Sequence, residues 1–275
     1  MQPPKQSDGK LKLRKRYPAK LNLISFRAHD LICAMMDLAS LHLLDEEADV
    51  AGPEGTVLPI YFVADCSGSM EGEPLDEVNR GLVSLLDALH SESMAASKVR
   101  FCVIGFDDET CCYIEPSDLR NLDSMPTLSP GGTTSYAAAF AELHRRLPLD
   151  VSNLKNAGYI VNRPAVFFLT DGLPNAGDRW EDFYARLTSA DFKQRPNVLA
   201  FGIGDAEPAT IKQIASKPEY AFVAARGVDT GRAIAEFVKA LTNSVIRSGQ
   251  ALASGQATLP IEKPEGFISL AIDAI

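Results

Sequence analysis

The sequence is poor in the residues that build disulfide scaffolds. Its 275 residues include five cysteines, an odd number with the neighbours Cys111 and Cys112 among them. Such a set does not predict a disulfide framework. Cys66 follows one apolar run and Cys102 lies inside another, so both are expected to be small buried thiols. This usage fits a reducing compartment and predicts a cytoplasmic protein.

Long hydrophobic runs are also missing. No window approaches the roughly 18 uninterrupted apolar residues that a membrane span needs. The apolar segment behind the basic first residues is broken by Arg27, His29 and Asp30, so a signal peptide is not expected. The sequence therefore predicts a soluble protein without a membrane contact.

Basic charge and the common catalytic motifs are scarce as well. Lysine and arginine total 27 against 36 aspartate and glutamate residues, and the net charge of −9 argues against a general nucleic-acid binder. There is no Gly-x-x-x-x-Gly-Lys-Ser/Thr phosphate loop and no Gly-x-Ser-x-Gly elbow of a hydrolase. The turn at 201–205 lacks the third glycine of a dinucleotide fingerprint, and the four histidines are scattered.

What the sequence does contain is an alternation of strand and helix patterns. Apolar runs that predict strands buried on both faces lie at 58–64, 99–106, 165–170, 198–203 and 220–224. Helical patterns lie between and after them, at 75–92, 135–147, 180–193, 208–216 and 230–247. The segment Thr110–Glu115 follows its neighbour too closely for a helical crossover, so we expect an antiparallel edge strand there. The pattern predicts an α/β fold: a doubly wound, mostly parallel six-stranded sheet with one antiparallel edge strand and helices on both faces.

We divide the chain into three parts. Residues 1–55 comprise a basic arm, a helix with a stripe formed by Leu31, Met35, Leu38 and Leu41, and an acidic linker. Residues 56–248 form the α/β domain, and residues 249–275 are a C-terminal extension. The helix has two interpretations: it docks permanently on the domain, or it serves as a separate recognition element for a partner.

Oxygen-bearing side chains gather where two of the expected strands end. Asp65, Ser67 and Ser69 follow the first strand at alternating positions, and Asp171 follows the strand at 165–170. The carboxyl ends of parallel strands share one edge of the sheet, which is where ligand sites form. Helix capping is an alternative role for Asp-x-Ser-x-Ser alone. Together these hard oxygen ligands suit Mg²⁺ first, and Mn²⁺ or Ca²⁺ after it.

Three segments of the sequence occur in a characteristic order: Asp65-x-Ser67-x-Ser69, then Gly131-Gly132-Thr133, then Thr170-Asp171-Gly172. Together they resemble the metal-ion-dependent adhesion site of von Willebrand factor A (VWA) domains. The resemblance assigns metal binding to five residues: Asp65, Ser67, Ser69, Thr133 and Asp171. Thr134, the neighbour of Thr133 in Gly131-Gly132-Thr133-Thr134, is a less favoured substitute for it. It implies that hydroxyls contact the ion, that aspartates act partly through water, and that a partner's Glu or Asp carboxylate completes the shell. The expected function is thus a non-enzymatic interaction or scaffold module. The alternative is a metal-dependent hydrolase of phosphate esters, which would normally need a positioned base that the sequence does not offer.

Within the VWA group the sequence is most similar to bacterial TerY-type proteins of tellurium-resistance and stress gene clusters. The similarity lies in Leu58-Pro59-Ile60-Tyr61, in Gly72-Glu73-Pro74-Leu75, in 78–82 and in 166–174. It implies a scaffold that works beside a protein kinase and a metal-dependent protein phosphatase. The first 55 residues depart from the compact form of that group, so a different set of partners is an open alternative.

Overall fold

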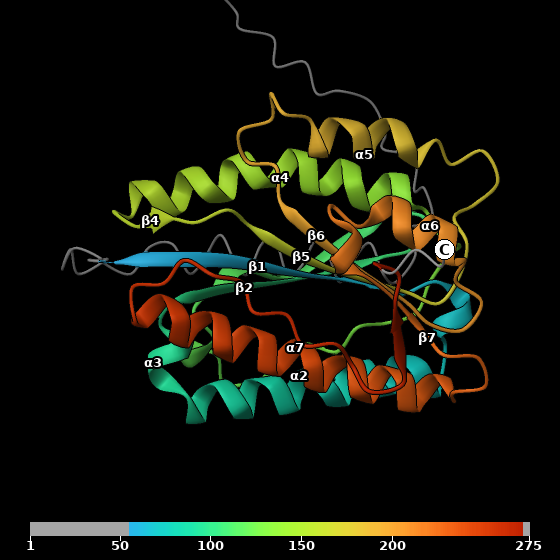
Figure 1. Cartoon of the computed structure of the whole chain (residues 1–275), viewed down its shortest axis with the longest axis horizontal. Coiled ribbons are helices and arrows are strands. Elements are labelled where there is room, and N and C mark those ends of the chain that lie inside the picture. The colour runs from blue at the N-terminus through green and yellow to red at the C-terminus, as the bar shows by residue number, and fades with distance from the viewer. Residues whose placement is uncertain (1–54, 272–275) are drawn as a thin grey trace, which may run out of the picture.

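Residues 55–271 are described by a computed structural model, shown in Figure 1, as one twisted sheet between two layers of helices. The strand order is β3-β2-β1-β5-β6-β7-β8, and the short strand β4 pairs with β1. The inner neighbours β2, β1, β5, β6 and β7 run parallel, which requires a crossover connection between successive strands. The expected doubly wound, mostly parallel α/β fold is confirmed.

The elements follow the apolar patterns of the sequence closely. The strands are β1 (Thr56–Asp65), β2 (Val99–Phe106), β3 (Thr110–Ser117), β4 (Ile160–Val161), β5 (Ala165–Thr170), β6 (Asn197–Gly202), β7 (Ala221–Ala224) and β8 (Phe267–Ser269). The α-helices are α2 (Glu73–Ser91), α3 (Ser93–Ala96), α4 (Tyr136–Asn156), α5 (Trp180–Thr188), α6 (Pro208–Ile214) and α7 (Thr230–Ala253). Three short 3₁₀ turns, η2 (Gly68–Met70), η3 (Leu119–Asn121) and η4 (Pro218–Tyr220), complete the described part.

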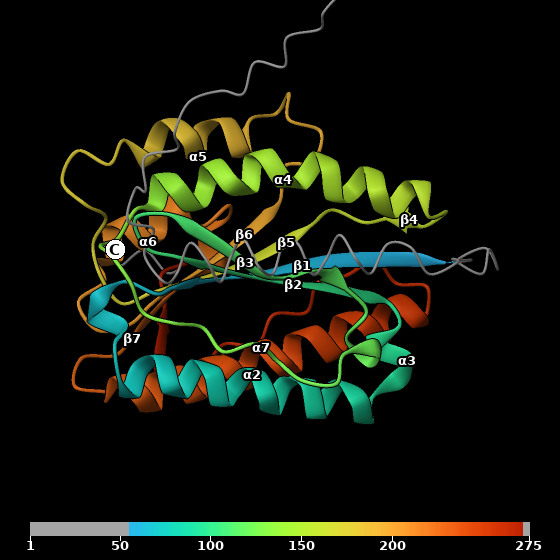
Figure 2. The same cartoon turned by 180° about the vertical axis from the view of Figure 1, so that it is seen from behind.

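Two hydrophobic cores lie on opposite faces of the sheet, because alternate residues of each central strand point to opposite sides. In β1, Ile60 and Phe62 belong to the core under α2 and α7, whereas Tyr61 and Val63 belong to the core under α4, α5 and α6. Figure 2 shows these two helical layers from behind. Both cores hold the central strands rigidly, so the strand ends that carry the site are fixed in position.

Within residues 55–271 the sheet has eight strands rather than the six expected. Two strands escape the sequence pattern because they are very short: β4 has two residues and β8 has three. β3 is antiparallel to β2 at one edge, as predicted, and β8 is antiparallel to β7 at the other edge. The end of the chain beyond residue 248 therefore contributes the last turn of α7 and an edge strand.

Three helix ends also differ from the expectation, and one of them is the end of α7, which lies at Ala253 instead of 247. Helix α4 continues through Pro148 to Asn156, although a proline removes one backbone hydrogen bond from a helix interior. Its last turns bury Val151 and Leu154, and this burial offsets the lost bond. Helix α5 ends at Thr188 instead of extending to 193.

The basic arm, the amphipathic helix and nearly all of the acidic linker lie outside the described residues. Among residues 55–271, no helix combines the length and the apolarity that a membrane crossing would require.

Candidate functional site

The predicted site residues lie at the carboxyl edge of the sheet. Asp65 is the last residue of β1, and Asp171 comes directly after β5, which is the parallel neighbour of β1. Ser67 and Ser69 follow in the turn that starts η2. Asp65 is fully buried, Ser67 is 2% exposed, and Ser69 is open to solvent. The side chains therefore form a short path from the interior of the sheet edge to the surface.

Hydrogen bonds connect four of the five predicted residues. The Asp65 carboxylate accepts a bond from the Ser67 backbone N–H at 2.9 Å, and the hydroxyls of Ser67 and Ser69 lie 3.1 Å apart. The Ser69 hydroxyl donates to Asp171 Oδ1 at 2.8 Å. The other oxygen of Asp65 accepts the Thr170 hydroxyl at 2.6 Å. The structure thus brings Asp65, Ser67, Ser69 and Asp171 together as one oxygen cluster.

Thr133 lies on the adjoining loop and makes no hydrogen bond to these four residues in the described structure. Its backbone N–H donates to Asp108 at 3.1 Å, and its hydroxyl donates to the same carboxylate. The Asn175 amide donates to the Thr133 hydroxyl at 2.7 Å. The loop 131–134, which contains Thr133, is hydrogen-bonded to the turn that follows β1, because the Gly68 N–H donates to the Gly132 carbonyl at 3.2 Å. Thr133 is therefore fixed beside the cluster by two side chains of other loops.

The backbone conformation of the loop 131–134 requires glycine at two positions. Gly132 has a φ of 29°, in the left-handed region, and a β-carbon there would lie 2.5 Å from an Asp108 oxygen. A β-carbon at Gly131 would lie 2.1 Å from an oxygen of Asp107. The close approach of this loop to the acidic turn thus depends on the Gly-Gly pair.

The two carboxylates of the cluster are buried. Burial raises the pKa of Asp65 to about 6, and hydrogen bonds from Ser67 and Thr170 only partly oppose this effect. Burial also raises the pKa of Asp171, and the charge of Asp205 adds to it. No lysine or arginine within residues 55–271 forms an ion pair with Asp65 or Asp171. A cation bound between them would supply the missing opposite charge.

Hydroxyls would have to provide most of the metal ligands. In the described part of the chain, no three His, Cys, Asp or Glu side chains gather in an arrangement that could hold an ion. The donor set of Ser67, Ser69 and Thr133, supported by two aspartates, fits a hard cation that prefers oxygen. The residues present are consistent with the predicted metal centre.

Sequence reasoning missed several residues that support the site. Thr170, next to Asp171, donates its hydroxyl to Asp65, and the Tyr136 hydroxyl oxygen lies 3.1 Å from the Thr170 hydroxyl oxygen. Asn175 contacts both threonines of the second loop, since its carbonyl oxygen accepts the Thr134 N–H at 3.1 Å. The only signals available were the position of Thr170 beside the final aspartate and the polarity of Asn175 in the same loop.

The sequence matches the von Willebrand factor type A domain family over residues 60–239. The chain belongs to this family. The match covers β1 to α7, and therefore includes every strand end that contributes to the oxygen cluster.

Relatives of this VWA chain are distant. An uncharacterized protein of Synechocystis is 28% identical over 149 residues, which make up 53% of this chain and 32% of that protein. The chain thus spans about a third of this relative, so the activity of the longer protein is not transferred.

Solved structures share the fold. A von Willebrand factor type A protein from Catenulispora acidiphila covers 70% of this chain at a TM-score of 0.50 and 15% identity, with 43% of its own length matched. The pilus adhesin SpaC of Lactobacillus rhamnosus covers 72% at a TM-score of 0.55 and 16% identity, over 31% of its length. A mussel byssus protein, PTMP1, with a zinc-occupied metal-ion-dependent adhesion site covers 70% at 0.51 and 17% identity, over 48% of its length.

Proposed function

We propose that this protein is a metal-dependent protein–protein interaction module that binds a Glu or Asp carboxylate of a partner through a divalent ion. Ser67, Ser69 and Thr133 hold the ion, and Asp65 and Asp171 orient these hydroxyls and the surrounding waters. The observation that carries the proposal is the hydroxyl cluster between two carboxylates that form no ion pair with a cationic side chain of residues 55–271. The ion supplies a positive charge that an outside carboxylate can reach.

The arrangement favours docking because the direct ligands are neutral. Both oxygens of Asp65 are already engaged, one by the Ser67 N–H and one by Thr170, so this carboxylate acts by orienting its neighbours. Hydroxyl ligands leave most of the ionic charge unneutralised, and a partner's carboxylate gains a charge-assisted contact. Ser69 and Thr133 are exposed, which leaves the cluster accessible from solvent.

The electrostatic field of the surrounding loops supports cation binding. The segments 66–76, 107–109, 129–135, 171–178 and 203–207 contain several acidic residues and not one lysine or arginine. All of them lie at the carboxyl edge of the sheet or adjoin it. A field of one sign raises the local concentration of the opposite ion, so these loops attract a divalent cation.

We propose Mg²⁺ as the ion, with Mn²⁺ or Ca²⁺ as substitutes. Mg²⁺ prefers oxygen ligands and keeps several of its waters, as a site with few protein ligands requires. The zinc-occupied site of the mussel protein makes zinc a competitor that the titration has to include. The proposal includes no catalytic activity, since no histidine contacts the hydroxyl cluster in the described part of the chain.

The proposal also includes a cellular setting. We place the protein in the cytoplasm, in a bacterial stress or tellurium-resistance type system with a protein kinase and a metal-dependent phosphatase as partners. Its support is the TerY-type similarity of 58–61, 72–75 and 166–174, together with the buried thiols of Cys66 and Cys102.

Calorimetric titration of the purified chain with Mg²⁺, Mn²⁺, Ca²⁺ and Zn²⁺ tests the proposed centre. We expect one site per chain with modest affinity, lost in the double variant Ser67→Ala/Thr133→Ala. Ser84→Ala/Thr242→Ala, which removes two hydroxyls distant from the cluster, is the matched control. Undiminished binding in the first variant would contradict the ligand assignment.

The partner contact is tested by affinity capture with and without EDTA, using Asp171→Ala as a genetic equivalent of the chelator. We expect both treatments to release the same protein while the domain stays folded by circular dichroism. A partner retained in EDTA would show that the contact does not use the ion. Turnover of a generic phosphoester that disappears in Asp65→Ala would favour the hydrolase alternative.

A further inference from the structure

The Thr133 hydroxyl donates to a carboxylate outside the five residues assigned to the metal site. This carboxylate belongs to Asp108, in the turn 107–109 between β2 and β3. The backbone N–H of Thr133 donates to Asp108 Oδ1 at 3.1 Å, and the Thr133 hydroxyl donates to the same oxygen. One carboxylate oxygen therefore fixes both the backbone and the side chain of Thr133.

The other two hydroxyls of the site are held in a similar way. The Asp65 carboxylate accepts hydrogen bonds from the backbone N–H of Ser67, at 2.9 Å, and from the Ser67 side chain. The Ser69 hydroxyl donates to Asp171 Oδ1 at 2.8 Å. Each of the three hydroxyls assigned to the ion thus has a carboxylate of its own. The carboxylate beside Thr133 matches the one beside Ser67, because both accept a backbone and a side-chain bond from the same residue.

The hydrogen bonds of Thr133 leave its oxygen able to bind a cation. A hydroxyl group has one proton to donate and two lone pairs that accept. Thr133 gives its proton to Asp108 and uses one lone pair to accept the Asn175 amide, at 2.7 Å. The second lone pair is left for an ion. Without an acceptor for the proton, the O–H bond would be free to rotate and to point its proton at the cation.

The loop 131–134 is shaped to receive the Asp108 carboxylate. A β-carbon at Gly132 would lie 2.5 Å from Asp108 Oδ2 and 3.1 Å from the Asp108 backbone nitrogen. The first of these distances is too short for any side chain at that position. The glycine of the loop and the carboxylate of the turn are therefore matched to each other, independently of the hydrogen bonds to Thr133.

We propose that Asp108 is a third outer carboxylate of the metal centre, a positioning residue that holds the Thr133 oxygen ready for the ion without touching the ion. This role rests on the metal-binding function proposed above. Outer-shell acceptors orient the groups that ligate a metal, and Asp108 does so for Thr133. Its exposed negative charge also attracts a cation to the mouth of the site.

Calorimetric titration with Mg²⁺ at physiological salt tests this role. Asp108→Ala removes both hydrogen bonds to Thr133 and is expected to weaken binding by about tenfold or more, the usual effect of losing an outer-shell partner. Glu109→Gln is the matched control, because it removes the same charge from the next exposed residue of the turn. Salt screens exposed charges, so the control should weaken binding by about threefold or less. Binding by Asp108→Ala that equals or exceeds that of the parent would overturn the proposal, since Asp108 would then be idle or would hold Thr133 away from the ion.

A double-mutant cycle separates positioning from charge. If Asp108 acts through Thr133, its replacement by alanine in a Thr133→Ala background should cost no more affinity than Glu109→Gln costs in the parent. An undiminished loss in that background would show an effect of charge or of the fold, and would overturn the proposal. Asp108→Asn keeps an acceptor oxygen of the same shape, so its affinity is expected to lie between those of the parent and Asp108→Ala.

Amide hydrogen exchange in EDTA supplies a readout that needs no metal. The Thr133 N–H is expected to exchange about tenfold faster in Asp108→Ala than in the parent, because it loses its acceptor. Glu109→Gln should leave this rate unchanged, and circular dichroism should show the same melting temperature for both variants. An unchanged Thr133 rate in Asp108→Ala would refute the positioning role.

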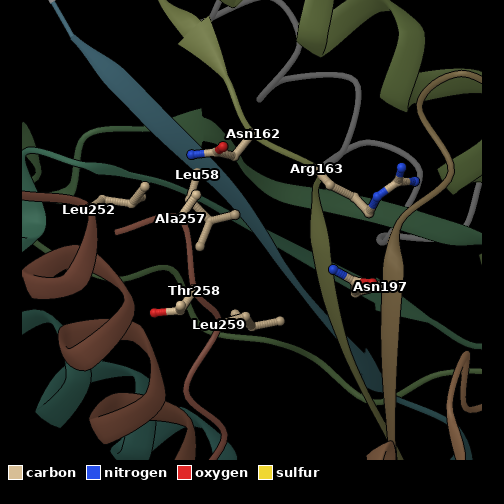
Figure 3. A pocket seen from close by; sticks show the side chains of 8 residues that line it. All are labelled: Leu58, Asn162, Arg163, Asn197, Leu252, Ala257, Thr258 and Leu259. Atoms are coloured by element: carbon tan, nitrogen blue, oxygen red, sulfur yellow. The ribbon is translucent and has the colours of Figure 1, made fainter. Parts of the chain in front are cut away.

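Arg163→Gln is a distant control for the titration. Arg163 lines the hollow of about 110 Å³ shown in Figure 3, where β5 begins, at the opposite end of the sheet from Thr133. Its Mg²⁺ affinity is expected to equal that of the parent, and a loss as large as that of Asp108→Ala would overturn a local role for Asp108. Failure of the proposed function looks different, because the parent chain itself then binds no ion and Asp108 loses its role together with the metal centre.

Discussion

Replacing Arg146 by methionine should destabilise the protein far more than the same change one residue earlier. Arg146 on α4 is only 5% exposed and donates to both Glu115 oxygens at 2.7 and 2.8 Å. It also lies 3.3 Å from Glu142 and 3.9 Å from Asp150. Asp150 is 8% exposed, so the substitution leaves a buried carboxylate without its cation.

The expected loss of unfolding free energy is about 3 to 5 kcal/mol, the usual cost of removing one partner of a buried ion pair. Arg145→Met is the matched control. Arg145 pairs with Glu142 at 2.7 Å, but its side chain is 61% exposed, so the change should cost about 0.5 kcal/mol or less. Urea unfolding followed by circular dichroism measures both. The reasoning is refuted if the two variants lose similar stability.

The pH dependence gives a second test of the same substitution. Burial raises the pKa of Asp150 in the folded state, and the positive charge of Arg146 opposes this rise. A carboxyl group with a raised folded pKa stabilises the fold most at low pH and loses this contribution as the pH rises through that pKa. Without Arg146 the pKa rises further, so the deficit of Arg146→Met should grow from about pH 5 to neutrality. A deficit that shrinks over this range would contradict the electrostatic explanation.

Three further outcomes are expected. In α7, Gly249→Ala should lower the free energy of unfolding by about 1 to 3 kcal/mol, because the new β-carbon would lie 2.3 Å from the Ala95 carbonyl oxygen. Gly231→Ala on the same helix is the control and should leave the melting temperature unchanged or raise it. Asn175→Ala should weaken Mg²⁺ binding in calorimetry with little change in melting temperature, because it releases the Thr133 hydroxyl. Tyr136→Phe should lower the free energy of unfolding by about 1 kcal/mol in urea titration, since it removes the hydroxyl that donates to the Gly172 carbonyl at 2.8 Å.

Most of the fold could be predicted from the sequence because its strands are long and apolar. β2 and β5 begin and end at the expected residues, and the close spacing of β3 to β2 fixed its antiparallel direction. β4 and β8 could not be predicted, because a strand of two or three residues is too short to show a periodic pattern. Each forms only when the folded sheet brings a neighbouring strand next to it. The passage of α4 through Pro148 depends on burial of later residues, which is a tertiary effect.

The candidate site divides in the same way. The positions of Asp65, Ser67, Ser69 and Asp171 follow from strand ends that the apolar pattern locates. The hydrogen bonds that position Thr133 could not be predicted in this way, because Asp108 and Asn175 lie 25 and 42 residues away from it in the sequence. Such contacts exist only once the sheet has brought the loops together.

The short strand β8 has a consequence for how the molecule meets its neighbours. It covers the outer side of β7 with three residues, while β3 at the opposite edge contains Pro116, which has no N–H to offer. Both rims are therefore poor templates for the strand of another chain. A chain shortened to end at Ala253 would uncover β7 and should form oligomers through sheet extension. By pairing with β7, the strand β8 occupies the backbone groups that another chain would otherwise use to extend the sheet.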